Sequence, residues 1–227
     1  VQETIQKIYN TYMEYRKKID IYYVAFSGGK DSVVALDLVQ RALPHDSFLV
    51  LFGDTQMEFE DTYSLVEKQK ELCKAENINF IVSKSEQSPD ITWREFGSPA
   101  QTMRWCCSVH KTAPQIMALR ELTNNPSFRG MAFTGIRADE SSTRSQYDDV
   151  TYGGKHKGQY SCHAILNWGS AEVFLYIYDN GLLLNETYKK GNSRAGCLVC
   201  PMAANKNFFF KEQSYGGDPK SRLSTTM

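Results

Sequence analysis

Short hydrophobic runs alternate with amphipathic stretches through most of the chain. The apolar, β-prone runs predict strands at residues 21–26, 48–52, 80–82 and 131–136. Stretches with helical spacing of apolar positions predict helices at 3–19, 31–43, 60–74, 111–122 and 171–178. Strands that alternate with helices of this length predict an α/β fold with a doubly wound, mostly parallel sheet, for which we expect five strands.

The polar segments that follow the strands are the expected location of a functional site. In a parallel sheet with right-handed crossovers, the loops after the strands gather at one edge, and ligands bind there. Candidate residues cluster after residues 26, 52 and 136. The polar, glycine-rich stretch 138–158 predicts a mobile loop.

Composition narrows the class of protein. The chain has 227 residues, 41% of them hydrophobic, which suits one globular domain. The 26 basic and 26 acidic residues balance, so a surface wholly dedicated to nucleic acid is excluded and a local basic groove is not. No apolar run approaches the ~18 residues of a membrane span. The chain begins without a secretory signal or an initiator Met, so we expect a fragment of a longer chain and, with six cysteines, a reducing cytoplasmic compartment.

The most specific motif joins the first expected strand to the following helix: Ser27-Gly28-Gly29-Lys30-Asp31-Ser32. Small residues let the backbone approach a ligand, and the helix start directs free N–H groups and its positive dipole end at the turn. Two serine hydroxyls and Lys30 add donors and charge, and we expect Lys30 and Asp31 to face solvent. The loop predicts an anion site of pyrophosphate size. A plain strand-to-helix turn is the alternative, and the spacing is not that of the Walker P-loop.

This string resembles the SGGxDS loop of the PP-loop ATP pyrophosphatases, which have an adenine nucleotide alpha hydrolase-like fold. The resemblance implies that the loop binds ATP and that Lys30 and Asp31 are catalytic in reactions that release pyrophosphate. It covers roughly residues 20–202 and implies a single domain over 1–227. Its parts are an N-terminal helix (1–19), a nucleotide-binding core (20–182) and a C-terminal segment with cysteines (183–227).

Two further segments are similar to motifs of the phosphoadenylyl-sulfate (PAPS) reductase-like group. Phe52-Gly53-Asp54-Thr55 resembles its second motif, which implies that Asp54 contacts the nucleotide or Mg²⁺; an N-cap-type turn is the alternative. Gly135-Ile136-Arg137, followed by Arg144, resembles a segment that recognises oxyanions, with Gly135 and Arg137 at the nucleotide and Arg137 catalytic. An exposed loop arginine is the alternative. Trp168 matches a later part of the pattern, although His163 stands near the position where the pattern places Pro. The residues that continue the pattern are Asn185, Tyr188, Gly191, Arg194, Gly196, Cys197, Cys200 and Pro201.

The cysteines form the second distinctive pattern. Cys106-Cys107 and the pair Cys197 and Cys200, spaced C-x-x-C, supply four soft ligands, for which zinc and [4Fe–4S] are both chemically suitable. The resemblance to adenylyl-sulfate (APS) reductases favours the [4Fe–4S] cluster, with Arg104 and Lys111 as nearby cations; reduced thiols without metal are the alternative. Cys73 is interpreted as a core residue and Cys162 as a candidate reactive, catalytic thiol. No cysteine follows Cys200, where the reductases carry their nucleophile.

The resemblance implies an ATP-dependent sulfur-transfer enzyme that uses Mg²⁺ and a [4Fe–4S] cluster. DNA phosphorothioation sulfurtransferases of the DndC type are the nearest functional model, which adds a nucleic-acid acceptor and a sulfur donor such as a cysteine desulfurase as expected partners. The alternatives are an APS or PAPS reductase that forms sulfite, and a non-catalytic nucleotide-binding module of a defence complex. The intact Lys30 and the missing cysteine after Cys200 weigh against the reductase.

Overall fold

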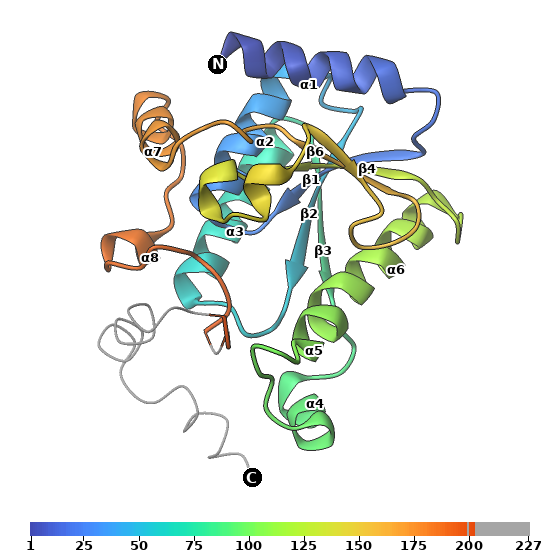
Figure 1. Ribbon diagram of the computed structural model, residues 1–227, viewed down its shortest axis with the longest axis vertical. Helices are drawn as coiled ribbons and strands as arrows, with labels where there is room; N and C mark the ends of the chain where they lie inside the picture. The colour runs from blue at the N-terminus through green and yellow to red at the C-terminus, as the bar shows by residue number, and fades with distance from the viewer. Residues whose placement is uncertain (199, 203–227) are drawn as a thin grey trace.

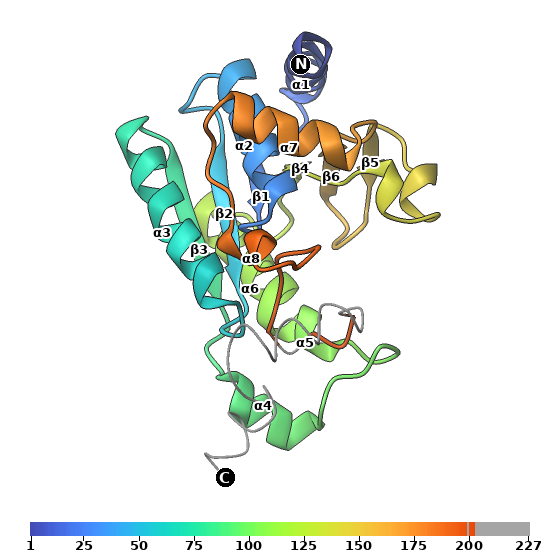
Figure 2. The same cartoon turned by 90° about the vertical axis from the view of Figure 1, so that its left-hand side faces the viewer.

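A computed structural model describes residues 1–198 and 200–202, which form a twisted sheet with helices on both faces (Figures 1 and 2). The sheet has six strands in the order β3-β2-β1-β4-β6-β5. Their bounds are β1 Ile21–Phe26, β2 Leu49–Asp54, β3 Asn79–Lys84, β4 Gly130–Thr134, β5 Val150–Tyr152 and β6 Gln159–His163. All neighbouring strands are parallel except β5, which runs antiparallel to β6.

The doubly wound α/β prediction is confirmed, and the strand number is corrected from five to six. All four strands that the hydrophobic runs located are present. Strands β5 and β6 lie in or beside the stretch 138–158 that we interpreted as a loop, which also contains the short turns η2 (Ala138–Glu140) and η3 (Arg144–Gln146). These strands escaped the pattern because one is three residues long and the other is mostly polar.

Helices cover the two faces of the sheet unequally. Their bounds are α1 Gln2–Tyr15, α2 Lys30–Ala42, α3 Glu60–Ala75, α4 Pro89–Phe96, α5 Trp105–Cys107, α6 Ala113–Thr123, α7 Ser170–Asp179 and α8 Glu186–Lys189. One large hydrophobic core packs α1, α2, α3 and α7 against the sheet, and a smaller core packs α6 against the other face. Crossovers that step outward in opposite directions from β1 produce this arrangement, and they leave a crevice between β1 and β4 at the carboxyl edge.

Short elements gather beyond that edge. Helix α5 continues through a π-helical turn, η1 (Ser108–Thr112), into α6 (Figure 2), and the short helix α8 contacts α3. A π-turn is often found at functional sites because it redirects side chains within a helix. Among the described residues, no helix has the length and apolar character needed to cross a membrane.

Candidate functional site

Glycines let the chain approach itself closely at the start of α2. Gly28 has φ +69°, and a Cβ there would lie 2.8 Å from Cγ2 of Thr62. A Cβ on Gly135 would lie 2.4 Å from the main-chain oxygen of Asp31, so the end of β4 passes directly against the first turn of α2. Glycine is therefore required at both positions, by backbone conformation at the first and by space at the second.

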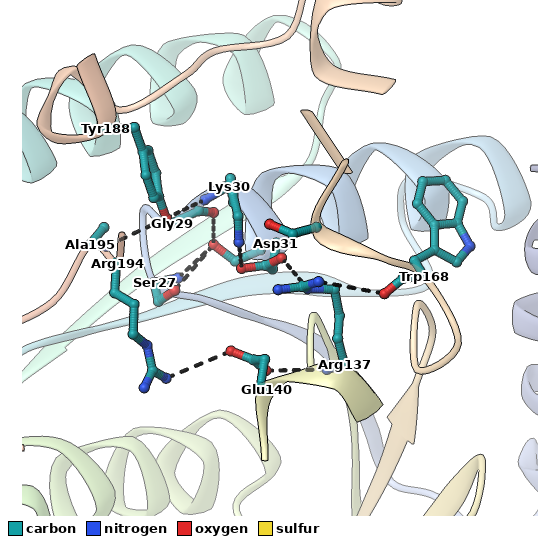
Figure 3. A network of polar contacts seen from close by, with 12 residues as sticks. Ser27, Gly29, Lys30, Asp31, Arg137, Glu140, Trp168, Tyr188, Arg194 and Ala195 are labelled. Atoms are coloured by element: carbon teal, nitrogen blue, oxygen red, sulfur yellow. Dashed lines mark hydrogen bonds and ion pairs between the residues drawn. The ribbon is translucent and has the colours of Figure 1, made fainter. Parts of the chain in front are cut away.

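Hydroxyl and amide groups hold the loop in place (Figure 3). The Ser27 main-chain and side-chain donors contact the Ser32 hydroxyl at 3.2 Å, and Ser32 donates to the oxygen of Gly29 at 2.8 Å. From the C-terminal part of the chain, the Tyr188 hydroxyl accepts the Lys30 N–H at 3.1 Å, and buried Asn185 donates to the oxygen of Gly28 at 3.0 Å. The N-cap residue Gly29 has no side chain, so the hydroxyl of Tyr188, from a distant segment, takes the first N–H of α2 at the positive end of the helix dipole.

Asp31 links the two cations closest to the loop. Its carboxylate accepts Nζ of Lys30 at 2.7 Å and Nε of Arg137 at 2.8 Å, and Arg137 also contacts Asp139 at 2.7 Å. Lys30 and Arg137 are 5% and 4% exposed, respectively. The expectation that Lys30 faces solvent is therefore wrong: its Nζ lies 5.7 Å from the ring centre of Phe174 and 5.8 Å from that of Tyr188.

A second carboxylate, Glu140, organises the arginines farther along the cleft. It forms an ion pair with Arg144 and another with Arg194 at 3.7 Å, and its carboxylate also accepts the main-chain N–H of Arg137. The predicted residues Arg137 and Arg144 thus lie beside the loop, Arg137 buried and Arg144 part-buried.

These groups line a cleft of about 1350 Å³ at the carboxyl edge of the sheet. We call the side that holds Lys30, Arg137, Arg144 and Arg194, each ion-paired to an acid, the paired side. The other side carries Arg104, Lys111 and Lys155, for which the described residues provide no carboxylate at ion-pair distance, and we call it the unpaired side.

Asp54 lies outside this lining. Its carboxylate accepts the N–H of Gln56 at 2.7 Å and the Tyr63 hydroxyl at 2.9 Å, and Gln56 has φ +61°. These contacts are those of a capped turn, the alternative that the sequence left open. No polar contact between Asp54 and the Ser27–Ser32 loop is found among the described residues, so its expected role at the nucleotide or Mg²⁺ stays a prediction.

The tandem cysteines lie on the unpaired side. Hydrogen bonding to the Cys107 sulfur raises the pKa of Cys106, and the same contact, helped by the charges of Arg104 and Lys111, lowers the pKa of Cys107 to about 6. Cys107 lines the cleft and is exposed. The hydrogen bond and the nearby cations therefore make Cys107 the more acidic of the two thiols.

Cys197 reaches the same neighbourhood through main-chain pairing with the loop after β2. An antiparallel bridge joins it to Glu58, and the N–H of Leu198 donates to the oxygen of Met57 at 2.7 Å. Its thiol donates to Glu58 at 3.5 Å, and burial raises the pKa of both groups, that of Cys197 to about 12. The charge of Cys197 acts on the pKa of Cys106, so these two cysteines lie near each other.

The four cysteines predicted as ligands are not arranged around a common metal position in the described residues. Within residues 1–198 and 200–202, no three His, Cys, Asp or Glu side chains are arranged to hold a metal ion. The donor set itself is the soft thiolate type that zinc and iron–sulfur clusters require. The predicted C-terminal segment 183–227 extends past these residues, because residues 199 and 203–227 lie outside the described part.

Strand β6 separates Cys162 from the cleft. Gln159, Ser161 and His163 line the cleft, whereas Cys162 is 0% exposed, contacts Thr11 of α1, and has a pKa raised by burial to about 11. Alternate side chains of a strand face opposite sides, so the interpretation of Cys162 as a reactive thiol is replaced by core packing. That alternation was the signal that would have found His163 and Ser161 as cleft residues.

Sequence reasoning missed several residues of the site. Glu58 docks Cys197, Glu140 pairs two arginines, and Lys155 lines the cleft from the turn between β5 and β6. Cys73, as predicted, is a buried residue.

The fold is that of a doubly wound α/β protein, with a glycine-rich loop at the carboxyl edge of its sheet. A family model, the phosphoadenosine phosphosulfate reductase domain, matches residues 21–203, and the chain belongs to this family. The solved phosphoadenylyl-sulfate reductase of Candida auris has a similar fold, with a TM-score of 0.62 and 19% identity over 84% of this chain and 87% of that one.

The relatives include archaeal proteins without an assigned activity and bacterial proteins named as reductases. An uncharacterized protein of Methanocaldococcus jannaschii is 34% identical over 84% of this chain and 44% of its own length. An adenosine 5'-phosphosulfate reductase of Oceanobacillus iheyensis is 27% identical over 89% of this chain and 80% of its own length. The chain spans only 44% and 38% of the two archaeal relatives that it matches.

Proposed function

We propose that this chain binds ATP at the Ser27–Ser32 loop, releases pyrophosphate from it and transfers sulfur to an activated acceptor. The observation that supports this most strongly is the glycine-rich start of α2, where the N-cap residue Gly29 supplies no side-chain cap and Asp31 fixes Lys30 and Arg137. A helix start with two positioned cations is a suitable binding site for a phosphate chain. Because the chain belongs to the phosphoadenosine phosphosulfate reductase domain family, we assign it an enzymatic function.

The described residues suit each part of this reaction. The acceptor oxygen attacks the α-phosphorus of ATP, the bond to the β-phosphate oxygen breaks, and the loop N–H groups and Lys30 stabilise the leaving pyrophosphate. The terminal sulfur of a persulfide, supplied by a donor such as a cysteine desulfurase, then displaces AMP from the acceptor. A second cysteine thiolate cleaves the resulting S–S bond, which leaves sulfur on the acceptor and forms a disulfide between the two thiols. Asp31 is the loop carboxylate that would hold Mg²⁺ together with phosphate oxygens, and the ion would neutralise their charge.

A [4Fe–4S] cluster on Cys106, Cys107, Cys197 and Cys200 completes the proposal. Cys106 and Cys197 lie near each other, and the pairing of Glu58 with Cys197 holds Cys197 in place. A bound cluster would supply a redox-active or electrostatic centre, and zinc is the competing occupant of the same thiols. Lys111 lies where its charge acts on both Cys107 and Cys197.

Reduction of APS or PAPS to sulfite is the second candidate, because several relatives that cover most of their own length are named adenosine 5'-phosphosulfate reductases. The products decide between the two. Turnover with α-labelled ATP should yield AMP and pyrophosphate, and Lys30→Gln should abolish it. Formation of sulfite from APS, with no AMP formed from ATP, would overturn sulfur transfer in favour of the reductase, and ADP as sole product would reject both.

The cluster is tested by anaerobic purification followed by iron and sulfide analysis. Serine at any one of the four cysteine positions should lower the iron content, whereas Cys73→Ser, in the core away from the cleft, should leave it unchanged. Equal iron in all variants would reject the ligand set, and colourless protein with one zinc per chain would retain the ligands and reject the cluster.

A further inference from the structure

The cleft is larger than one small molecule needs. Its volume is about 1350 Å³, whereas sites for single small ligands usually measure roughly 300–1,000 Å³. A nucleotide with its phosphates at the Ser27–Ser32 loop occupies the paired side. Space therefore remains along the unpaired side, where the turn between β5 and β6 forms the wall.

Lys155 is the cation of that wall. It projects from the glycine-rich turn between β5 and β6 and lines the cleft, close enough to Lys111 for their charges to repel. Although Lys155 is accessible from the cleft, the surrounding protein and then the charge of Lys111 lower its pKa to about 8. Two neighbouring cations that have no acid between them repel each other, and a bound anion relieves that repulsion.

Two polar side chains of the same hairpin, Gln159 and Ser161, are held in place by a hydrogen bond. Gln159 is 3% exposed and its amide donates to the Ser161 hydroxyl at 3.3 Å; both residues line the cleft. Because Ser161 accepts that bond, its own hydrogen is free to be donated to a ligand. On the same hairpin, Tyr152 is 60% exposed at the cleft and offers a ring at the rim.

We propose that Lys155, with Ser161 and the adjacent Lys111, forms a second anion subsite that takes a phosphate group of the acceptor while the nucleotide occupies the Ser27–Ser32 loop. That the phosphate group belongs to the acceptor rests on the proposed function, whereas the subsite itself depends only on the geometry of the hairpin. A phosphate group suits a lysine, a hydroxyl donor and a second cation at the wall of an open cleft.

The test is a calorimetric titration of inorganic phosphate into the chain saturated with Mg²⁺ and the α,β-methylene analogue of ATP, which blocks the loop. Lys155→Gln should weaken phosphate binding by about tenfold. Lys157→Gln is the matched control, because Lys157 lies two residues away in the same turn, is exposed and does not line the cleft. It should change phosphate affinity less than about twofold. Both variants should bind the nucleotide analogue like the wild type.

The outcomes separate this subsite from the proposed function. Phosphate binding that depends on Lys155 in a protein that does not bind the analogue would support the subsite and reject ATP binding. Equal phosphate affinity in wild type and Lys155→Gln would overturn the subsite, as would loss of analogue binding in that variant alone. A short single-stranded oligonucleotide then identifies the source: tighter, salt-dependent binding than phosphate indicates a polymer, and equal affinity a free phosphate; both support the subsite.

Discussion

The two sides of the cleft carry similar numbers of cations but differ in what those cations contact. On the paired side, Lys30 and Arg137 share Asp31, and Arg144 and Arg194 share Glu140. On the unpaired side, Arg104, Lys111 and Lys155 have no ion pair among the described residues. The first set is fixed by ion pairs within the protein, whereas the second set is held by no such pair and, in our proposal, contacts an anionic ligand.

This difference separates structural from functional charge. Buried cations such as Arg137 must be paired to be tolerated, and their acids therefore hold strand ends and helix starts together. Exposed cations such as Arg104 cost little to leave unpaired in water. Substitutions on the paired side should consequently lower stability and binding together, whereas those on the unpaired side should alter binding alone.

The largest expected effect is that of Arg137→Ala. It leaves Asp31 without one of its two cations and Asp139 without its ion pair. Removing one partner of a buried pair costs roughly 3–5 kcal/mol, and because Asp139 is half exposed we expect about 3 kcal/mol in urea unfolding. Arg104→Ala on the unpaired side should change the free energy of unfolding by less than about 0.5 kcal/mol. Similar losses in both variants would contradict the distinction.

Gly135→Ala tests the close passage of β4 against α2. The added Cβ would meet the Asp31 main-chain oxygen at 2.4 Å, so one of the two elements must shift. We expect a loss of about 1–3 kcal/mol and weaker nucleotide binding, because the loop geometry depends on that contact. Gly154→Ala, where no atom lies within 4 Å, is the control and should be neutral. A neutral Gly135→Ala would show that the contact carries no strain.

The smallest effect concerns pH and His163, which lies between Thr134 and Thr151 at the cleft wall. Burial, and then the charges of Lys7 and Arg144, lower its pKa to about 4. Since the folded form binds the proton less readily than the unfolded chain, stability is complete above pH ~6.5 and falls as the pH drops toward 4. Between pH 7 and 5 the loss attributable to His163 should be about 1–2 kcal/mol. Denaturant midpoints in His163→Gln should fall less steeply; parallel profiles would contradict this.

The sequence predicted those parts of the fold that rest on local signals. Strands β1, β2 and β4 are buried, and β1 and β2 are continuous apolar runs, so their positions follow from hydrophobicity. Helix α4 and strands β5 and β6 were missed, because they are short and mostly exposed or polar. Their places are set by pairing with β4 and by docking against α5, which no local pattern encodes.

In the candidate site, the sequence indicated which residues take part more readily than it indicated which residues they contact. The loop string and Arg137 were found, but Asn185, which holds Gly28 from 157 residues away, shows its role only in the folded chain. The same holds for Glu58 and Cys197, separated by 139 residues. Lys30 was assigned to solvent because helix starts are usually exposed, and the rings of Phe174 and Tyr188 that cover it come from distant segments.

The most direct test of nucleotide binding on the paired side is calorimetric titration of ATP, with Mg²⁺, into wild type and into Lys30→Gln. Circular dichroism should confirm that the variant is folded, since Lys30 is buried. We predict one ATP per wild-type chain, competition by pyrophosphate, and at least about tenfold weaker binding in the variant, because a charge-assisted contact to phosphate is lost. Equal ATP affinity in the two folded proteins, or no binding to wild type, would contradict the account.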